Sequence, residues 1–272
     1  MLCGPIWSRT VPTIIEPMVR NGLPITDSWV FPDWPAPSPV RAVVTTRHGP
    51  GVSTAPFDRL NLGLRSGDAV EIVQANRGGL QEALALPAAP RWLHQVHGTT
   101  VTELGPFPSA DEPQADAAIS HLPGTVLAIL TADCLPVLFC AADGREIAAA
   151  HAGWRGLLNG VLEETLTGLR TPRENILAWL GPCIGAASYE VGDEVRTAFV
   201  EFDPAAASCF AATRPSHWLC DLAAMARLRL RAAGVSHIYG GGFDTFTDPR
   251  FYSYRRDGAC SGRFCSLIWL EP

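Results

Sequence analysis

The sequence contains no lysine, so all 21 of its basic residues are arginine. This absence excludes a lysine Schiff base or a lysine nucleophile, and it leaves planar, permanently charged guanidinium groups to hold phosphate or carboxylate. No apolar run reaches the roughly 18 residues of a membrane-spanning helix. The N-terminal stretch lacks the basic and continuous apolar segments of a secretory signal peptide. We therefore expect a cytoplasmic protein that does not bind a membrane.

Charge is also sparse. Charged residues make up 18% of the chain and hydrophobic residues 47%, which is typical of a compact globular protein. The formal net charge of −6 argues against non-specific nucleic-acid binding. No linker, repeat or low-complexity block divides the 272 residues. We expect one catalytic domain over residues 18–272, a loose N-terminal extension over residues 1–17, and a monomer or homodimer.

Apolar periodicity predicts strands and helices without strict alternation, which favours a single α/β domain with a mixed sheet. Asp221 is a plausible N-cap and Gly234 a C-terminal stop for one of the helices. The predicted strands lie within residues 41–49, 91–98, 124–142, 146–156, 175–185 and 263–272, and the predicted helices within 67–86, 156–170, 191–202 and 221–234.

Three segments share one pattern, in which an apolar stretch ends at a polar residue beside glycine or proline: HQVHG, TADCLP and AAAHAGWRG. Strands that end in such turns place their last side chains at the edge of a sheet, where a pocket can form. The residues concerned are His97, Cys134 and His151. Two imidazoles and one thiolate suit zinc in an open tetrahedral site, with copper as the next choice.

The residues alone leave other interpretations of these three side chains open. A cysteine after an apolar strand is usually a buried small hydrophobic group, and a lone histidine is usually a satisfied polar group. A Cys134 nucleophile with His151 as its base is a further alternative, which needs no metal. Of the other cysteines, Cys140 and Cys183 suit packing, and Cys260 and Cys265 form only a weak pair signal.

The segments TTRHGPGVS, LNLG, NRGGL, HQVHGTTV, ADAAIS, TADCLPVLF, AAAHAGWRG, GPCIGAASYEVGDEV and FYSYRRDGACSGRF occur in this order. Together they resemble the YfiH-type laccase-domain family, whose members are also called multicopper polyphenol oxidases and purine nucleoside phosphorylases. The resemblance runs from about residue 40 to the C-terminus. Two turns, HGPGVS and the one after SYRRD, are each one residue longer than the family pattern.

The resemblance implies a single layered α/β/β/α domain with mixed β-sheets, distantly similar to a bacterial toxin deamidase. It implies metal ligation by His97, Cys134 and His151. It also implies a zinc-dependent enzyme that cleaves adenosine, inosine, guanosine and methylthioadenosine with phosphate and that deaminates adenosine. Two alternatives are a laccase-like copper polyphenol oxidase, for which seven histidines are few, and a Cys-dependent amide hydrolase that edits peptidoglycan precursors.

Phosphorolysis needs donors for phosphate, and arginine binds phosphate through two parallel hydrogen bonds. Arg77 in NRGGL is the first candidate, on the strength of the resemblance, and we place it among the catalytic residues. Arg47, Ser53 and Arg155 are further candidates for binding phosphate or substrate. For each arginine the commoner role is a structural ion pair.

Zinc lowers the pKa of bound water, so an open zinc site accounts for deamination more directly than for phosphorolysis. Asp133, beside Cys134, is a weak candidate for the general acid or base, and it could equally orient a ligand. Tyr189, Phe251 and Tyr252 could stack on a purine, with core packing as the default for each.

Overall fold

The computed structural model describes residues 19–20, 23–24, 27–107 and 111–272, so the predicted extension over residues 1–17 lies outside the described residues. Within these ranges the larger sheet has six strands, in the order β14 (His237–Gly240), β10 (Ile176–Leu180), β8 (Leu135–Ala141), β9 (Ile147–Ala152), β6 (Ala117–Ser120) and β5 (Val101–Glu103). The pairs β10–β14 and β5–β6 are parallel and the other pairs are antiparallel, so the sheet is mixed, as predicted.

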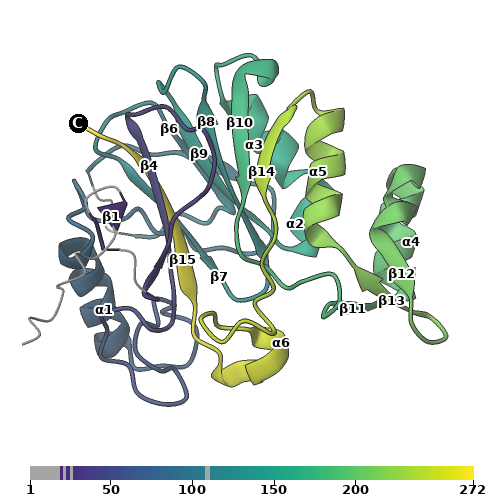
Figure 1. The fold of residues 1–272 in the computed structure, drawn as a ribbon, viewed down its shortest axis with the longest axis horizontal. Coiled ribbons are helices and arrows are strands. Elements are labelled where there is room, and N and C mark those ends of the chain that lie inside the picture. Colours follow the sequence, from purple (N-terminus) through teal and green to yellow (C-terminus); the bar gives the residue numbers. More distant parts are fainter. Residues whose placement is uncertain (1–18, 21–22, 25–26, 108–110) are drawn as a thin grey trace, which may run out of the picture.

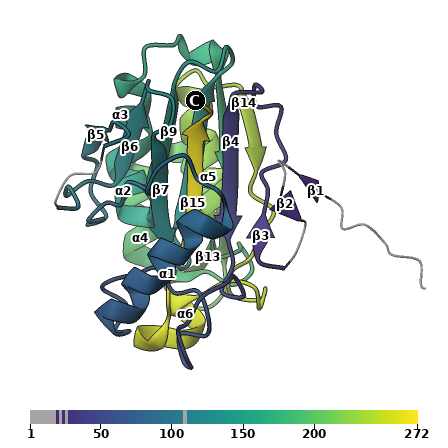
Figure 2. The same ribbon diagram turned by 90° about the vertical axis from the view of Figure 1, so that its left-hand side faces the viewer.

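A second, antiparallel sheet lies against the first. It has four strands in the order β3 (Trp29–Val30), β4 (Val40–Thr45), β15 (Phe264–Leu270) and β7 (Val126–Thr131). Helices α2 (Trp154–Asn159), α3 (Val161–Gly168) and α5 (Leu222–Ala232) cover the outer face of the six-stranded sheet, and α1 (Val70–Ala83) covers the four-stranded sheet (Figure 1). Figure 2 shows α1 in front of the second sheet.

The apolar core follows these layers, because successive side chains of a strand point to opposite faces. In β8, Val137 and Phe139 pack toward the helices, whereas Leu138 and Cys140 pack toward the four-stranded sheet. A third cluster joins that sheet to α1 through Leu80. All residues of β8 and β9 are buried, as expected for strands covered on both sides. The predicted single-domain α/β/β/α architecture is confirmed.

Two predicted elements differ from the structure. The helix predicted over residues 156–170 is two helices, since Gly160 takes a φ of +100°, which ends α2 and redirects the chain into α3. The strand predicted over residues 91–98 is wrong. That segment forms isolated bridges, from Arg91 to Leu127 and from His94 to Gln114. Because the segment pairs with two different parts of the chain, it forms no continuous ladder of backbone hydrogen bonds with either.

A small lobe projects beside α5 (Figure 1). It combines α4 (Asp193–Phe202) with a three-stranded sheet in the order β11 (Glu190–Gly192), β13 (His217–Cys220) and β12 (Phe210–Ala212). The remaining elements are the pair β1 (Val19–Arg20) and β2 (Leu23–Pro24), the short helix α6 (Tyr254–Asp257), and 3-10 turns at Arg173–Asn175, Pro204–Cys209 and Gly258–Cys260. Among the described residues, no helix has the length and apolar character to cross a membrane.

Candidate metal centre and cavity

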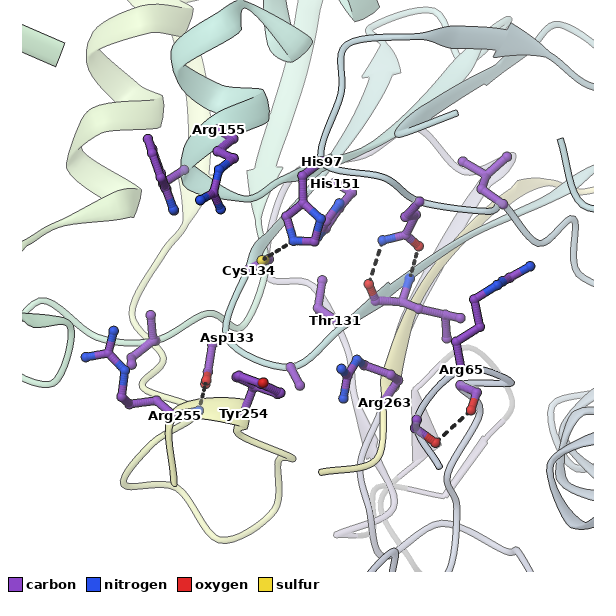
Figure 3. Close-up of a pocket in the computed structure, with 18 of the residues that line it drawn as sticks. Arg65, His97, Thr131, Asp133, Cys134, His151, Arg155, Tyr254, Arg255 and Arg263 are labelled. Atoms are coloured by element: carbon purple, nitrogen blue, oxygen red, sulfur yellow. Dashed lines mark hydrogen bonds between the residues drawn. The ribbon is translucent and has the colours of Figure 1, made fainter. Parts of the chain in front are cut away.

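Three side chains converge at one end of the six-stranded sheet: His97, Cys134 and His151 (Figure 3). His151 lies in β9 and pairs with Pro136 of β8, so Cys134, the residue immediately before β8, is brought beside it. His97 comes from the loop before β5. One ligand atom from each residue lies within 4.8 Å of the others, and the Cys134 Sγ is 3.7 Å from the His97 Nε2. The predicted convergence is therefore present in the structure.

A buried carboxylate, Asp116, holds both histidines of the cluster in place. Its Oδ1 accepts hydrogen bonds from His151 Nδ1 at 2.8 Å and from the His97 backbone N–H at 2.8 Å. Its Oδ2 accepts from the N–H groups of Val96 and Gly98 at 3.1 and 2.7 Å. With Nδ1 engaged, His151 presents Nε2 as its free nitrogen, which is the role of such carboxylates around metal-binding histidines.

The loop that carries His97 is shaped by the same contacts and by Gln95. His97 has a φ of +62°, a left-handed conformation that costs energy in a residue with a side chain and that the Asp116 hydrogen bonds offset. Gln95 donates to the Leu130 carbonyl and accepts from the Leu130 N–H, at 2.8 and 2.9 Å. The Gln95 side chain thus occupies the edge of β7 where a paired strand would otherwise lie.

The electrostatics of the centre favour a thiolate beside an imidazolium. Burial on its own raises the pKa of the Cys134 thiol, but the charge and hydrogen bonds of His151, and then those of His97, outweigh burial and lower the pKa to about 6. Burial opposes the charging of His151, but Cys134 and Asp116 raise its pKa to about 9. The pKa of Asp116 is lowered, because hydrogen bonds from His151 and the loop outweigh its burial.

This donor set fits a zinc ion. Zinc–nitrogen and zinc–sulfur bonds of about 2.0 and 2.3 Å at a tetrahedral angle separate the two ligand atoms by about 3.5 Å. The observed separation of 3.7 Å between Sγ and Nε2 is close to that value. The glycine that follows β9 leaves the space clear: a Cβ on Gly153 would lie 2.8 Å from His97 Cδ2 and 3.0 Å from Cys134 Sγ.

The three residues open onto a cavity of about 490 Å³, a size typical of small-molecule sites. Figure 3 shows its four arginines in two groups, with Arg155 and Arg255 on one side of the centre and Arg65 and Arg263 on the other. The apolar and aromatic lining includes Leu93, Leu130, Trp154, Ile184, Tyr189 and Tyr254. Such a cavity can bind an anionic group and a flat ring at the same time.

Arg155, which the sequence predicted to bind substrate, lines the cavity with its guanidinium 4.4 Å from the Trp154 ring. Arg47, Ser53 and Arg77 are placed elsewhere, among other partners. Arg47 pairs with Asp58. Ser53 is buried and donates to an Asp68 carboxylate oxygen at 2.6 Å.

Arg77 is largely enclosed, with only 11% of its side chain exposed. It donates to a Glu112 oxygen at 2.7 Å and to the Leu62 carbonyl at 2.9 Å, and its guanidinium stacks 4.1 Å from the Trp92 ring. These contacts fix Arg77 behind the cavity wall, where it does not line the cavity.

Asp133 has a structural function. Its Oδ1 accepts a hydrogen bond from the Thr245 hydroxyl at 2.7 Å, and its Oδ2 accepts one from the main-chain N–H of Arg255 at 2.6 Å. Both carboxylate oxygens therefore hold the 245–255 segment against the cavity, which leaves Asp133 poorly placed as a general base. The cysteines Cys140 and Cys183 are fully buried, as predicted for packing.

Among the aromatic candidates, Tyr189 lines the cavity, whereas Phe251 and Tyr252 are fully buried in the core. Sequence reasoning missed Asp116, Arg65, Arg255, Arg263 and Tyr254. The motifs ADAAIS, LNLG and FYSYRRDGACSGRF mark most of these neighbourhoods, but a motif does not reveal which side chain faces the site.

Comparisons with known proteins show the family of this chain. A family model described as multi-copper polyphenol oxidoreductase laccase matches residues 41–271. A purine nucleoside phosphorylase of Xylella fastidiosa is 54% identical over 254 residues, which cover 89% of this chain and 97% of that protein. Purine nucleoside phosphorylase YfiH of Escherichia coli is 50% identical over 242 residues, covering 89% and 98%.

Solved structures show the same fold. A crystal structure of a Neisseria meningitidis protein matches with a TM-score of 0.85 and 43% identity, covering 90% of this chain and 100% of that one. The crystal structure of YlmD from Geobacillus stearothermophilus matches with a TM-score of 0.79 and 30% identity, covering 90% and 97%.

Proposed function

The chain belongs to the multi-copper polyphenol oxidoreductase laccase family, and on that premise we propose that it is a metal-dependent enzyme acting on purine nucleosides. The observation that carries the proposal is the shared cavity, which joins a His–Cys–His cluster to four guanidinium groups and an aromatic wall. The proposed reactions are phosphorolysis of adenosine, inosine, guanosine and methylthioadenosine, and deamination of adenosine. Relatives named purine nucleoside phosphorylase support the first of these.

We assign His97, Cys134 and His151 as the metal ligands, with zinc as the metal. When bound by three protein ligands, zinc supplies a Lewis acid with one position open to water or substrate. The protein's own groups do the rest. Asp116 keeps the His151 ring oriented. The cavity arginines offset the charge of phosphate, and Tyr189 and Tyr254 offer ring faces to the purine.

The test is incubation of the purified protein with adenosine and phosphate, following adenine, inosine and ribose-1-phosphate, together with metal analysis. We expect adenine and ribose-1-phosphate from phosphorolysis, inosine from deamination, and about one zinc per chain. Cys134→Ala should lose the zinc and at least 100-fold in both rates, because one of three ligands is removed. The matched control is Cys140→Ala, a buried cysteine that packs between the sheets and lies outside the cluster.

Full turnover in metal-free Cys134→Ala protein would refute the assignment. Copper in place of zinc, with oxidation of a phenol and no consumption of nucleoside, would favour the oxidase that the family's name describes. A laccase-like oxidase needs several copper sites. Among the described residues, His97, Cys134 and His151 form the single cluster of three or more potential ligands.

A second candidate is a metal-free hydrolase of amides, including peptidoglycan precursors. The observation that favours it is the order Cys134, His151, Asp116, which matches a nucleophile, a base and an orienting carboxylate. In that reaction the thiolate adds to the amide carbonyl, the imidazolium protonates the leaving amine, and water releases the acid from the thioester. An acyl adduct on Cys134 by mass spectrometry, with release of an amino acid from a muropeptide precursor and no bound metal, would select it.

A further inference from the structure

The turn over residues 63–66 and Arg263 are far apart in the chain but form one wall of the cavity. Asn61, which is fully buried, joins them. Its Oδ1 accepts from the Gly63 N–H at 3.0 Å and from the Arg263 N–H at 2.9 Å, and its Nδ2 donates to the Ser66 hydroxyl at 2.7 Å. One amide side chain therefore fixes the distance between the turn and Arg263.

Close packing adds to this connection. A Cβ on Gly63 would lie 2.6 Å from Arg263 Cγ, so the glycine allows the Arg263 side chain to lie directly on the turn. The Arg263 Nη1 donates to the carbonyls of Ser261 and Gly262 at 2.6 and 2.9 Å, which holds the guanidinium plane in place. Burial lowers the pKa of Arg263. In the described part of the chain, no carboxylate forms an ion pair with its guanidinium.

A second guanidinium is held beside the first. Arg65 donates to Glu112 Oε2 at 2.8 Å, while Arg77 donates to the other oxygen of the same carboxylate at 2.7 Å. Because Arg77 is stacked on Trp92 and enclosed, Glu112 is a fixed anchor. One carboxylate shared by two arginines leaves the neighbourhood of Arg65 positive.

The turn itself contributes further donors. Leu64 and Arg65 line the cavity, and among the described residues their main-chain N–H groups have no protein acceptor. Two guanidinium groups and free N–H groups of a turn are the donors that bind oxyanions in proteins. Arg65, Arg155 and Arg255 are all exposed, but of these three only Arg65 is held by a carboxylate in the described part of the chain, whereas Arg255 Nη1 donates to the Glu190 carbonyl.

We propose that the turn 63–66 and Arg263 form the phosphate subsite of this cavity, with Arg65 as a phosphate ligand and with Asn61 and Glu112 as positioning residues. This inference rests on the proposed phosphorolysis and names the place of its second substrate. Two of the residues predicted from sequence to bind phosphate, Ser53 and Arg77, lie one layer behind this subsite. Asn76 donates to the Ser53 hydroxyl and to the Asn61 carbonyl, both at 2.8 Å.

The experiment uses the zinc-loaded full chain and compares Arg65→Ala, Arg65→Lys and Glu112→Gln with the wild type. Inosine phosphorolysis is measured against phosphate concentration, and adenosine deamination is measured without phosphate. Arg65→Ala should raise the KM for phosphate about 10-fold, the size expected for one charge-assisted contact, and raise the ratio of deamination to phosphorolysis by a similar factor. Arg65→Lys should restore part of the loss.

Glu112→Gln should raise the KM for phosphate about threefold and leave the KM for inosine unchanged, because the Arg65 hydrogen bond is weakened but not removed. The matched arginine control is Arg145→Ala, whose side chain is 87% exposed beside Asp143. That control should leave both reactions at wild-type rates.

Calorimetry measures the binding of inorganic phosphate to the same proteins directly. This measurement separates the inference from the proposed function. Binding that weakens about 10-fold in Arg65→Ala supports the subsite even where no nucleoside is consumed. The subsite is overturned by phosphate affinity that Arg65→Ala leaves unchanged, or by a loss confined to Arg155→Ala or Arg255→Ala. Equal loss of deamination and phosphorolysis in Arg65→Ala also overturns it.

Discussion

At the scale of single residues, the centre depends on Asp116 as much as on the three ligand candidates. The sequence pattern predicted His97, Cys134 and His151, because each stands where an apolar stretch ends beside glycine or proline. Nothing comparable marks Asp116. Its partners are three consecutive backbone N–H groups of a distant loop and one imidazole nitrogen. Contacts to backbone groups leave no trace in residue type or spacing, so only the folded chain reveals them.

We predict that Asp116→Asn weakens zinc binding about 10- to 100-fold, the usual effect of removing a carboxylate behind a metal-binding histidine. An amide has one acceptor oxygen, so it cannot serve His151 Nδ1 and all three N–H groups of the loop. Competition with a chelator measures the affinity. Asp143→Asn, in an exposed turn, is the matched control. Unchanged affinity in a folded Asp116→Asn protein would show that the loop holds His97 without this carboxylate.

The arginines show a different limit of sequence reasoning. The sequence indicated that guanidinium groups would hold an anion, and the cavity has four of them. Yet Arg77, the first candidate for phosphate in the sequence, and Arg47, a further candidate, are paired with Glu112 and Asp58. A carboxylate partner does not by itself decide which arginine faces the cavity, since Arg65 and Arg77 share Glu112 and only Arg65 lines it.

At the scale of elements, periodicity predicted most of the core strands and helices. The apolar runs around β4, β7, β8, β9, β10 and β15 are strands, and Asp221 caps α5 by accepting from the Ala224 N–H at 2.8 Å. The failed strand at residues 91–98 contains the apolar residues Trp92, Leu93 and Val96, but the Gln95 side chain takes the hydrogen bonds of Leu130 that a strand would need. Residue pattern cannot distinguish a backbone partner from a side-chain partner.

The junction of β9 and α2 gives a prediction at this scale. Gly153 has φ −64° and ψ 159°, which alanine adopts without strain, so only the space around its Cβ matters. That Cβ would lie 2.8 Å from His97 Cδ2 and would displace the ring. We expect Gly153→Ala to weaken zinc binding at least 10-fold while the protein remains folded.

Gly78→Ala is the matched control for that substitution, because Gly78 lies inside α1 with no atom within 4 Å of its added Cβ. It should leave zinc affinity unchanged and raise the free energy of unfolding by about 0.5–1 kcal/mol. Chelator competition and urea denaturation measure the two quantities. Wild-type zinc affinity in Gly153→Ala would mean that the His97 loop tolerates the shift.

At the scale of the whole molecule, the site lies where two sheets meet. In β9, Ala148, Ala150 and Ala152 face the helices, so the intervening His151 faces the four-stranded sheet. The loop with His97 and the loops around Arg65 and Arg263 close the same end of the sheets. The family resemblance implied the four layers, but their relative placement depends on contacts between residues hundreds of positions apart, such as Asn61 with Arg263.

The last prediction concerns the acid stability of the whole fold. Several carboxyl groups bridge distant loops, and Asp244 is typical. Burial raises its pKa, but hydrogen bonds from Ser188, Gly185 and Phe246 outweigh burial and lower it. The pKa of Glu190 falls to about 2, through its hydrogen bonds to Arg214 and Thr213. In each case the unfolded chain binds a proton at a higher pH than the folded chain does.

The free energy of unfolding must therefore rise with pH between about pH 2 and pH 5. The contribution of these carboxylates to stability is complete above the ordinary carboxyl pKa of about 4. As the pH falls from about 5 toward 2, the folded state loses these hydrogen bonds, and the urea midpoint should fall steadily. Asp244→Asn should lower stability by about 1 kcal/mol at pH 7 and make the midpoint less sensitive to acid, because one bridging charge is gone. Asp143→Asn should keep the wild-type pH profile. A midpoint that is constant between pH 5 and 3, or an Asp244→Asn profile parallel to the wild type, would show that these carboxylates do not couple the loops to folding.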